Sequence, residues 1–190
     1  VDFPISNLSN SGIDRIQIYV KEKPRTLVSH ISTGRHYNIN SKSGRLQILF
    51  TDSDQRNNIY NTDIASYYEN MECIEEMHHP YVVITPDYMV YTADFSKLIE
   101  QHIQSEADIT LLYHAVDNAK DAYLNCNILN LNKQKGVLSI EPNHGNAKNR
   151  NIFMDTYIMK KDLFIELIRK AKAISSAFTL ADIINELHNE

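Results

Sequence analysis

The residue with the clearest potential for chemistry is Asp87, which follows a short apolar run. Residues 81–84 read Tyr-Val-Val-Ile and lead into Thr85-Pro86-Asp87, a pattern typical of a strand buried on both faces of a parallel sheet. Ligands of open α/β sheets lie beyond the carboxyl ends of strands. A carboxylate there can hold Mg²⁺, which takes one or two protein carboxylates besides phosphate oxygens. The alternative is a turn or helix cap, because Pro-Asp also favours turns.

Other polar segments give weaker signals. His78 and His79 precede the apolar run, and residues 143–146 read Asn-His-Gly-Asn. No Cys, His or Glu lies around them at metal-site spacing, so solvated loops are the simpler interpretation. The chain contains no G-x-S-x-G, P-loop or G-x-G-x-x-G pattern. The residues alone therefore predict an α/β domain that binds a phosphorylated ligand.

The elements that must position Asp87 alternate between strand and helix along most of the chain. The apolar patterns predict strands at 13–20, 46–50, 81–84, 109–113, 123–131, 136–140 and 152–159. They predict helices at 24–31 (closed by Gly34), from 62 or 63 to 74, at 94–103, at 161–172 and at 180–187. The alternation favours one α/β domain with a mainly parallel sheet.

Caps are expected for two of these helices, and the second helix also has an expected inward face. Thr62 or Asp63 is expected to cap the second helix, and Asp94 the third. The side chains expected to face inward on the second helix are Ile64, Tyr67, Tyr68, Met71 and Ile74.

Composition excludes several classes of function. Of the 190 residues, 43% are hydrophobic and 23% charged, and the formal net charge is -5, so the basic surface of a nucleic-acid-binding protein is missing. No apolar run approaches the roughly 20 residues of a membrane span. Cys73 and Cys126 are far apart in sequence, which is typical of reduced thiols in a cytoplasmic protein.

Four ordered segments carry a resemblance to a known family. Residues 1–13 (Val-Asp-Phe-Pro-Ile-Ser-Asn-Leu-Ser-Asn-Ser-Gly-Ile) resemble the I-D-F-x-L-S-N-x-x-N-S-G-I segment of glucose-1-phosphate adenylyltransferases. Residues 26–34 are similar to that family's S-L-x-x-H-I-x-x-G helix, and residues 102–110 to its H-x(4)-A-D-I-T stretch. Residues 153–159 lie where the family has A-S-M-G-I-Y-I-F. The resemblance runs through nearly the whole chain.

This resemblance implies a Rossmann-like, GT-A-like nucleotidyltransferase domain with a mainly parallel mixed sheet flanked by helices. The implied reaction converts ATP and glucose 1-phosphate into ADP-glucose and pyrophosphate during glycogen biosynthesis, with Mg²⁺ as cofactor. Catalysis of this kind rests on positioning and on neutralising phosphate charge. The family's phosphate loop, its second metal carboxylate and its C-terminal β-helix domain have no counterpart in residues 1–190, so we expect a nucleotidyltransferase domain truncated at both ends.

The chain departs from the family pattern where the nucleotide and the metal would bind. The family's G-D-H at the metal strand reads Pro86-Asp87-Tyr88, so Asp87 is kept without its neighbours. The family's G-T-A-D-A reads Tyr-Asn-Thr-Asp-Ile at 60–64, which makes Asn61, Thr62 and Asp63 a degenerate nucleotide-binding segment. The glycine that would let the backbone approach a ligand is lost.

The sugar-phosphate pocket implied by the resemblance is altered in the same way. The family's E-K-P reads Glu141-Pro142 without the lysine, and the glycine of S-M-G becomes Asp155, two residues before the retained Tyr157. Losing the lysine removes a charge-assisted bond to phosphate, and a carboxylate at 155 would repel phosphate. Lys148 is a candidate substitute cation, because it lies in a polar loop.

These departures resemble the GlgD-type subunit, a regulatory subunit that pairs with a catalytic GlgC-type partner. An adenylyltransferase that is active despite substituted residues is one alternative. A non-enzymatic module that senses a sugar phosphate or nucleotide is the other.

Overall fold

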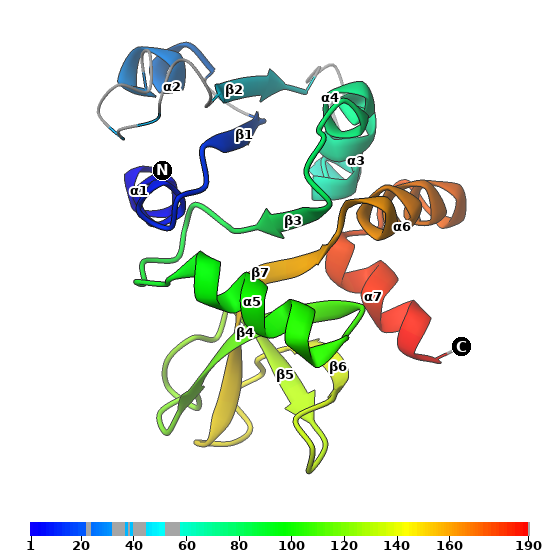
Figure 1. Cartoon of the computed structure of the whole chain (residues 1–190). Helices are drawn as coiled ribbons and strands as arrows, with labels where there is room; N and C mark the ends of the chain where they lie inside the picture. Colours follow the sequence, from blue (N-terminus) through cyan, green and yellow to red (C-terminus); the bar gives the residue numbers. More distant parts are fainter. Residues whose placement is uncertain (22–23, 32–36, 38, 40–44, 52–57, 190) are drawn as a thin grey trace.

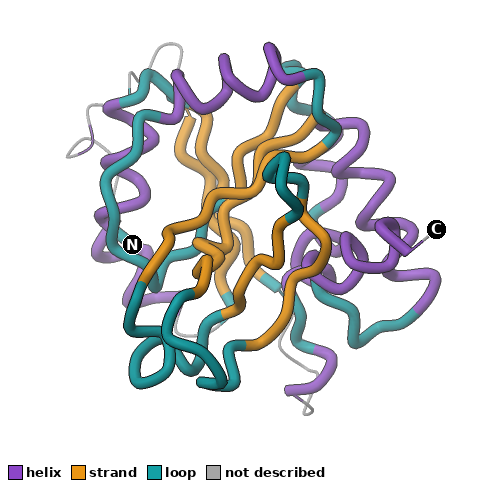
Figure 2. The backbone as a smooth tube through the Cα atoms, turned by 90° about the horizontal axis from the view of Figure 1, so that it is seen from below, coloured by secondary structure: helices purple, strands orange, loops and turns teal. Residues whose placement is uncertain are grey.

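The computed structural model describes residues 1–21, 24–31, 37, 39, 45–51 and 58–189, and it places strands in a central layer with helices on both sides (Figures 1 and 2). Its helices are α1 (Asp2–Asn10), α2 (Pro24–Ile31), α3 (Asp63–Glu69), α4 (Met71–Glu75), α5 (Phe95–Ser105), α6 (Lys161–Ile174) and α7 (Leu180–Asn189). Its strands are β1 (Arg15–Val20), β2 (Arg45–Phe50), β3 (Tyr81–Ile84), β4 (Ile109–Val116), β5 (Asn127–Leu131), β6 (Val137–Pro142) and β7 (Arg150–Lys160). The expected α/β class is confirmed. Gly34, which was expected to close the helix at 24–31, lies outside the described residues.

Strand pairing differs from the mainly parallel arrangement that the alternation favoured. Strands β1 and β2 form a separate two-stranded parallel sheet. In the five-stranded sheet, β7 pairs antiparallel with β3, β4 and β5, and β5 pairs antiparallel with β6. Four strands follow one another from β4 to β7 without a helix between them. Short connections of this kind join antiparallel strands, because a parallel pair needs a long crossover.

Apolar side chains form a separate core on each side of the strand layer. The larger core packs β3, β5, β6 and β7 against α3, α4, α6 and α7; its most buried members include Ile74, Phe153, Met159, Leu167, Ile168, Leu180 and Ile183. The smaller core joins α1, α2, β1 and α5 through Ile5, Leu8, Ile16, Ile31 and Phe95. Val82 faces the larger core and Val83 the smaller one, as the alternation of side chains along a strand requires.

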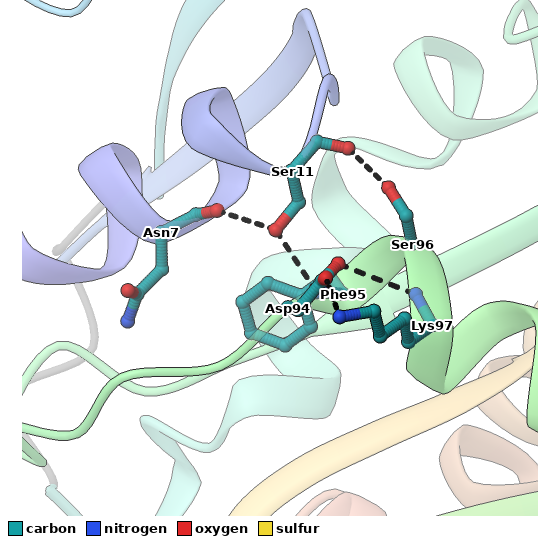
Figure 3. A network of polar contacts seen from close by, with 6 residues as sticks. All are labelled: Asn7, Ser11, Asp94, Phe95, Ser96 and Lys97. Carbon is teal, nitrogen blue, oxygen red and sulfur yellow. Dashed lines mark hydrogen bonds and ion pairs between the residues drawn. The ribbon is translucent and has the colours of Figure 1, made fainter.

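Helix α1 was not among the helices that the sequence patterns predict, and polar contacts hold it against α5. The Ser11 hydroxyl donates to the Asn7 carbonyl at 2.7 Å and accepts from the Phe95 N–H at 2.9 Å (Figure 3). The Ser96 hydroxyl donates to the Ser11 carbonyl. At the start of α5 the Asp94 carboxylate accepts from the Lys97 N–H at 3.3 Å, which confirms the predicted cap. The Asn and Ser residues of the opening segment therefore join two helices.

Three details correct the expected elements. Tyr68 was expected to face inward but is 46% exposed, since the helix ends at Glu69 and a second one begins at Met71. The strand expected from residue 123 begins at Asn127, because Tyr123 has a positive φ of 60°. Strand β4 extends to Val116, beyond the predicted end at 113. In the part of the chain that the structure describes, no helix is long and apolar enough to cross a membrane.

Candidate functional site

The segment Asn61–Asp63 lies at the start of α3, and each of its residues makes a defined contact. The Thr62 hydroxyl accepts from the Ala65 N–H at 3.2 Å, which confirms the predicted cap. The Asp63 carboxylate accepts from the Ile64 N–H at 2.8 Å and from the Leu180 N–H at 3.2 Å. Burial raises the pKa of Asp63 above its ordinary value, and the two backbone N–H groups oppose that shift. Asp63 therefore ties α3 to the first residue of α7.

Lys21 is a cation of this site that the sequence patterns did not single out. It directly follows β1, and its Nζ donates to the Asn61 carbonyl at 2.8 Å. Burial lowers the pKa of Lys21, while the Asp63 charge acts in the opposite direction. The sequence feature that could have identified Lys21 is the one used for Asp87: a charged residue at the carboxyl end of a strand.

Asp155 lies in an irregular part of β7. The register between β4 and β7 jumps from Leu112↔Thr156 to Tyr113↔Phe153, so Met154 and Asp155 have no partner residue on β4. Asp155 has a φ of 42°, a backbone conformation that glycine adopts freely and that Asp tolerates better than most residues. The bulge removes the Asp155 side chain from the regular alternation of the strand.

Asp155 and Asp63 lie within electrostatic reach of one another. Burial first, and then the Asp63 charge, raise the pKa of Asp155 to about 6. Burial, Asp155 and Asp63 together also raise the pKa of Tyr157. Asp63 of the predicted nucleotide segment thus acts electrostatically on two residues of the predicted sugar-phosphate pocket. Tyr157 itself is only 5% exposed and packs edge-on to Phe153 with ring centroids 5.0 Å apart.

Asp87 leaves the sheet at the same end as Asp155. Ile84, the last residue of β3, pairs with Tyr157 on antiparallel β7. The chain continues from Ile84 toward Asp87, while on β7 the residues before Tyr157 lead back to Asp155. In an antiparallel pair these two directions coincide. Asp87 is exposed to solvent, so its carboxylate is available to a ligand.

Glu141 lies at the edge of the five-stranded sheet, on β6. It pairs with Ile128 of β5, and Ile128 pairs with Ile152 of β7. The exposed Glu141 carboxylate accepts from the Ser139 hydroxyl at 2.7 Å. Lys148 is exposed, and its carbonyl accepts from the Ala119 N–H at 2.9 Å. Glu141 is therefore two strands away from the bulge that carries Asp155.

Metal binding at this end of the sheet would rest on few protein ligands. Among residues 1–21, 24–31, 37, 39, 45–51 and 58–189, no group of three or more His, Cys, Asp or Glu side chains is placed to hold a metal ion. One exposed carboxylate, Asp87, still fits Mg²⁺ that takes its other ligands from phosphate oxygens and water. The site is thus suited to a metal that arrives with a phosphorylated ligand.

Two surface hollows lie apart from these residues. One, of about 770 Å³, is lined by Tyr68, Glu69, Met71, Glu72, Arg169, Lys172 and Ala173. The other, of about 590 Å³, is lined by His114, Ala115, Val116, Asp117, Asn118, Tyr123 and Asn149. Neither is lined by a residue of the predicted site, so the chemistry of the side chains and not these hollows defines the candidate site.

Known proteins resemble the chain in sequence and in fold. A glucose-1-phosphate adenylyltransferase of Clostridium perfringens (strain SM101 / Type A) is 30% identical over 159 residues, which make up 83% of this chain and 40% of that protein. The enzyme of the same name from Clostridioides difficile (strain 630) is 25% identical over 173 residues, 90% of this chain and 44% of that protein. The chain thus spans about two fifths of the length of these relatives.

A solved structure shows the same fold. HddC from Yersinia pseudotuberculosis has a TM-score of 0.67 and 14% identity, with 93% of this chain and 67% of that chain covered. At this identity the likeness concerns the fold alone. The family model for nucleotidyl transferases matches residues 1–189. With nearly every residue matched, this chain belongs to the nucleotidyl transferase family.

Proposed function

We propose that this chain is part of a regulatory, GlgD-type subunit of a glucose-1-phosphate adenylyltransferase, with a weakened active site of its own. The adenylyltransferase part of the proposal is supported by relatives named glucose-1-phosphate adenylyltransferase that match most of the chain. The family reaction joins ATP and glucose 1-phosphate into ADP-glucose and pyrophosphate. Its place would be glycogen biosynthesis in the cytoplasm, beside a catalytic GlgC-type subunit.

The observation that favours weak turnover is the pair of carboxylates Asp63 and Asp155. Both are partly buried, and the Asp63 charge contributes to the raised pKa of Asp155. A sugar phosphate or a nucleotide phosphate bound here would meet negative charge where a transferase needs cations. The Glu141-Pro142 sequence also lacks the lysine that resemblance to the family leads us to expect. Of these features, Asp155 and the missing lysine depart from the family pattern, and both oppose the stabilisation of phosphate charge.

Residues of this chain could still bind substrates. Asp87 would hold Mg²⁺, which supplies charge neutralisation of the phosphates when bound. Asn61 and Thr62 would contact the nucleotide, and Glu141 the sugar. Binding without efficient transfer is the behaviour that we expect of a regulatory subunit.

The test is ADP-glucose synthesis by the full-length subunit, alone and mixed with a catalytic subunit from the same cell. We expect little synthesis by the subunit alone, and a changed rate or substrate affinity in the mixture. Synthesis by the subunit alone at the rate of the catalytic one would contradict the regulatory assignment. A mixture with the same rate and substrate affinity as the catalytic subunit alone would favour a separate sensing module that binds the metabolites.

One observation favours the second candidate, a competent adenylyltransferase. Lys21 places a cation beside Asn61, where it could replace the missing lysine, and Lys148 is the other candidate. Lys21→Met and Lys148→Ala should each be compared with the unmodified full-length protein. A loss of synthesis in one variant, with unchanged folding, would identify the substitute cation, and two unchanged rates would exclude both.

A further inference from the structure

A chain of three hydroxyl groups connects the residue that follows β3, Thr85, with the irregular part of β7. The Tyr91 hydroxyl oxygen lies 2.9 Å from Thr85 Oγ1 and 2.6 Å from Thr156 Oγ1. The Thr156 hydroxyl in turn donates to the Met154 carbonyl at 2.9 Å. Thr156 is only 1% exposed, so solvent does not compete for its hydroxyl group.

The direction of these hydrogen bonds follows from the number of protons. Each hydroxyl has one proton to donate. Thr156 uses its proton on the Met154 carbonyl, so Tyr91 must donate to Thr156, and Thr85 must donate to Tyr91. The bonds therefore run from Thr85 through Tyr91 and Thr156 to Met154, and the Tyr91 hydroxyl is the only link between the two threonines in this chain of bonds.

The two ends of this hydroxyl chain lie close in sequence to two carboxylates of the candidate site, Asp87 and Asp155. Thr85 precedes Asp87 by two residues, and Met154 directly precedes Asp155. The backbone of Tyr91 is held independently, because the Asn7 amide donates to its carbonyl at 2.6 Å. Tyr91 thus joins α1, the segment that carries Asp87 and the bulge that carries Asp155.

We infer that Tyr91 is a positioning residue, whose hydroxyl sets the placement of the Asp87 segment relative to the Asp155 bulge and so the affinity for a metal-bound nucleotide. This inference rests on the proposed function for its ligand, Mg²⁺-ATP. Groups that orient metal ligands from behind typically change affinity about 10- to 100-fold when they are removed. The hydroxyl chain holds the backbone two residues before Asp87 and not the Asp87 carboxylate itself, so we expect an effect at the lower end of that range.

The experiment compares four variants of the full-length protein. Tyr91→Phe removes the linking hydroxyl and keeps the ring, and Thr156→Val removes the acceptor of the Tyr91 proton. Thr156→Ser keeps the hydroxyl, and Tyr123→Phe removes an exposed tyrosine hydroxyl elsewhere. We expect Mg²⁺-ATP affinity to fall about tenfold in Tyr91→Phe and Thr156→Val, and to stay within about twofold of the unmodified protein in the other two.

Hydrogen exchange of the backbone amides supplies a second measurement that needs no ligand. We expect faster exchange over residues 85–91 and 153–157 in Tyr91→Phe and Thr156→Val than in Thr156→Ser. Unchanged exchange in Tyr91→Phe would overturn the hydroxyl link itself. Faster exchange with unchanged Mg²⁺-ATP affinity would overturn the positioning role. If the unmodified protein binds no Mg²⁺-ATP, the proposed function fails, and amide exchange alone then decides whether the link exists.

Discussion

At the scale of single residues, Asp155 combines a strained backbone with a partly buried charge. Its φ of 42° is a conformation that costs a non-glycine residue roughly 1 kcal/mol or more. Asp155→Gly removes both the strain and the carboxylate, so we expect the free energy of unfolding to rise by about 1 kcal/mol at neutral pH. Urea unfolding measures this change.

Asp155→Asn is the matched control, because it keeps the strain and removes only the charge. Its stability should fall between those of the glycine variant and the unmodified protein. A glycine variant less stable than the asparagine variant would contradict the strain at this position.

The pH dependence of stability provides another prediction at Asp155. Its pKa in the folded state is raised from 3.8 to about 6, so the folded protein holds the proton more tightly than the unfolded chain. The stability that this group contributes is therefore complete below about pH 4 and is lost as the pH rises through about 6.

The measurement is the difference in urea midpoint between the unmodified protein and Asp155→Asn, followed across that range of pH. The difference cancels the contributions of Asp2 and Asp94, whose pKa values are lowered by hydrogen bonds to their partners, mainly Tyr37 and Lys97. A difference independent of pH would show that Asp155 titrates normally in the folded protein.

At the scale of elements, Ser11 joins α1 to α5. Ser11→Ala leaves the Phe95 N–H without its side-chain acceptor, and we expect a loss of about 1–2 kcal/mol of unfolding free energy. Ser96→Ala, which removes a solvent-exposed hydroxyl from the same contact, should cost less than about 0.5 kcal/mol. Equal losses in the two variants would contradict the role assigned to Ser11 at the start of α5.

Asn143 holds together the segments that flank β5 and β6. Its side chain is 3% exposed; its amide donates to the Ala119 and Tyr123 carbonyls at 2.9 and 3.0 Å and its Oδ1 accepts from the Gly145 N–H at 3.1 Å. Asn143→Ala removes these three contacts, of which the one to Ala119 is buried and the other two partly buried, so we expect a loss of about 2–3 kcal/mol. Asn146→Ala, at an exposed position of the same loop, is the control and should change the stability little.

The sequence was sufficient to predict most elements, because their apolar spacing and their caps are local. Thr62 and Asp94 cap the helices that their positions indicate. Helix α1 was missed, since its Ser and Asn residues favour turns and only contacts such as that between Ser11 and Phe95 hold it in place. The antiparallel pairing could have been predicted from the succession of strands without helices after residue 109.

The candidate site was harder to predict than the elements. The sequence indicated Asp63 and Asp155 separately, and no periodicity shows that they approach one another. The environment of Asp155 depends on the bulge of β7 and that of Asp63 on its contact with α7, and both result from long-range contacts. Lys21, in contrast, could have been found from its position directly after a strand.

At the scale of the whole molecule, the two sheets should differ in local stability. Strands β1 and β2 pair only with each other in the described part of the chain, and they pack on the smaller core. Strand β7 pairs with three strands and packs on the larger core. Amides of β1 should therefore exchange with solvent through a lower opening free energy than those of Ile152–Met159.

Native-state hydrogen exchange of the full-length protein measures both opening free energies in one sample. Amides of β1 as slow as those of β7 would contradict this difference, and would show that the two sheets open only together.

The central position of β7 also affects the order in which the elements can pair while the ribosome synthesises the chain. Strands β3, β4 and β5 all pair with residues between Arg150 and Lys160. At about 5–20 residues per second, the ribosome needs roughly 3–13 seconds to synthesise the residues between the end of β3 at Ile84 and the start of β7 at Arg150. During that time β3, and later β4, are without their common partner. We therefore expect cotranslational folding of this chain to begin with helices, the β1–β2 pair and the β5–β6 pair, and β3 and β4 to join the larger sheet only when residues 150–160 have left the exit tunnel.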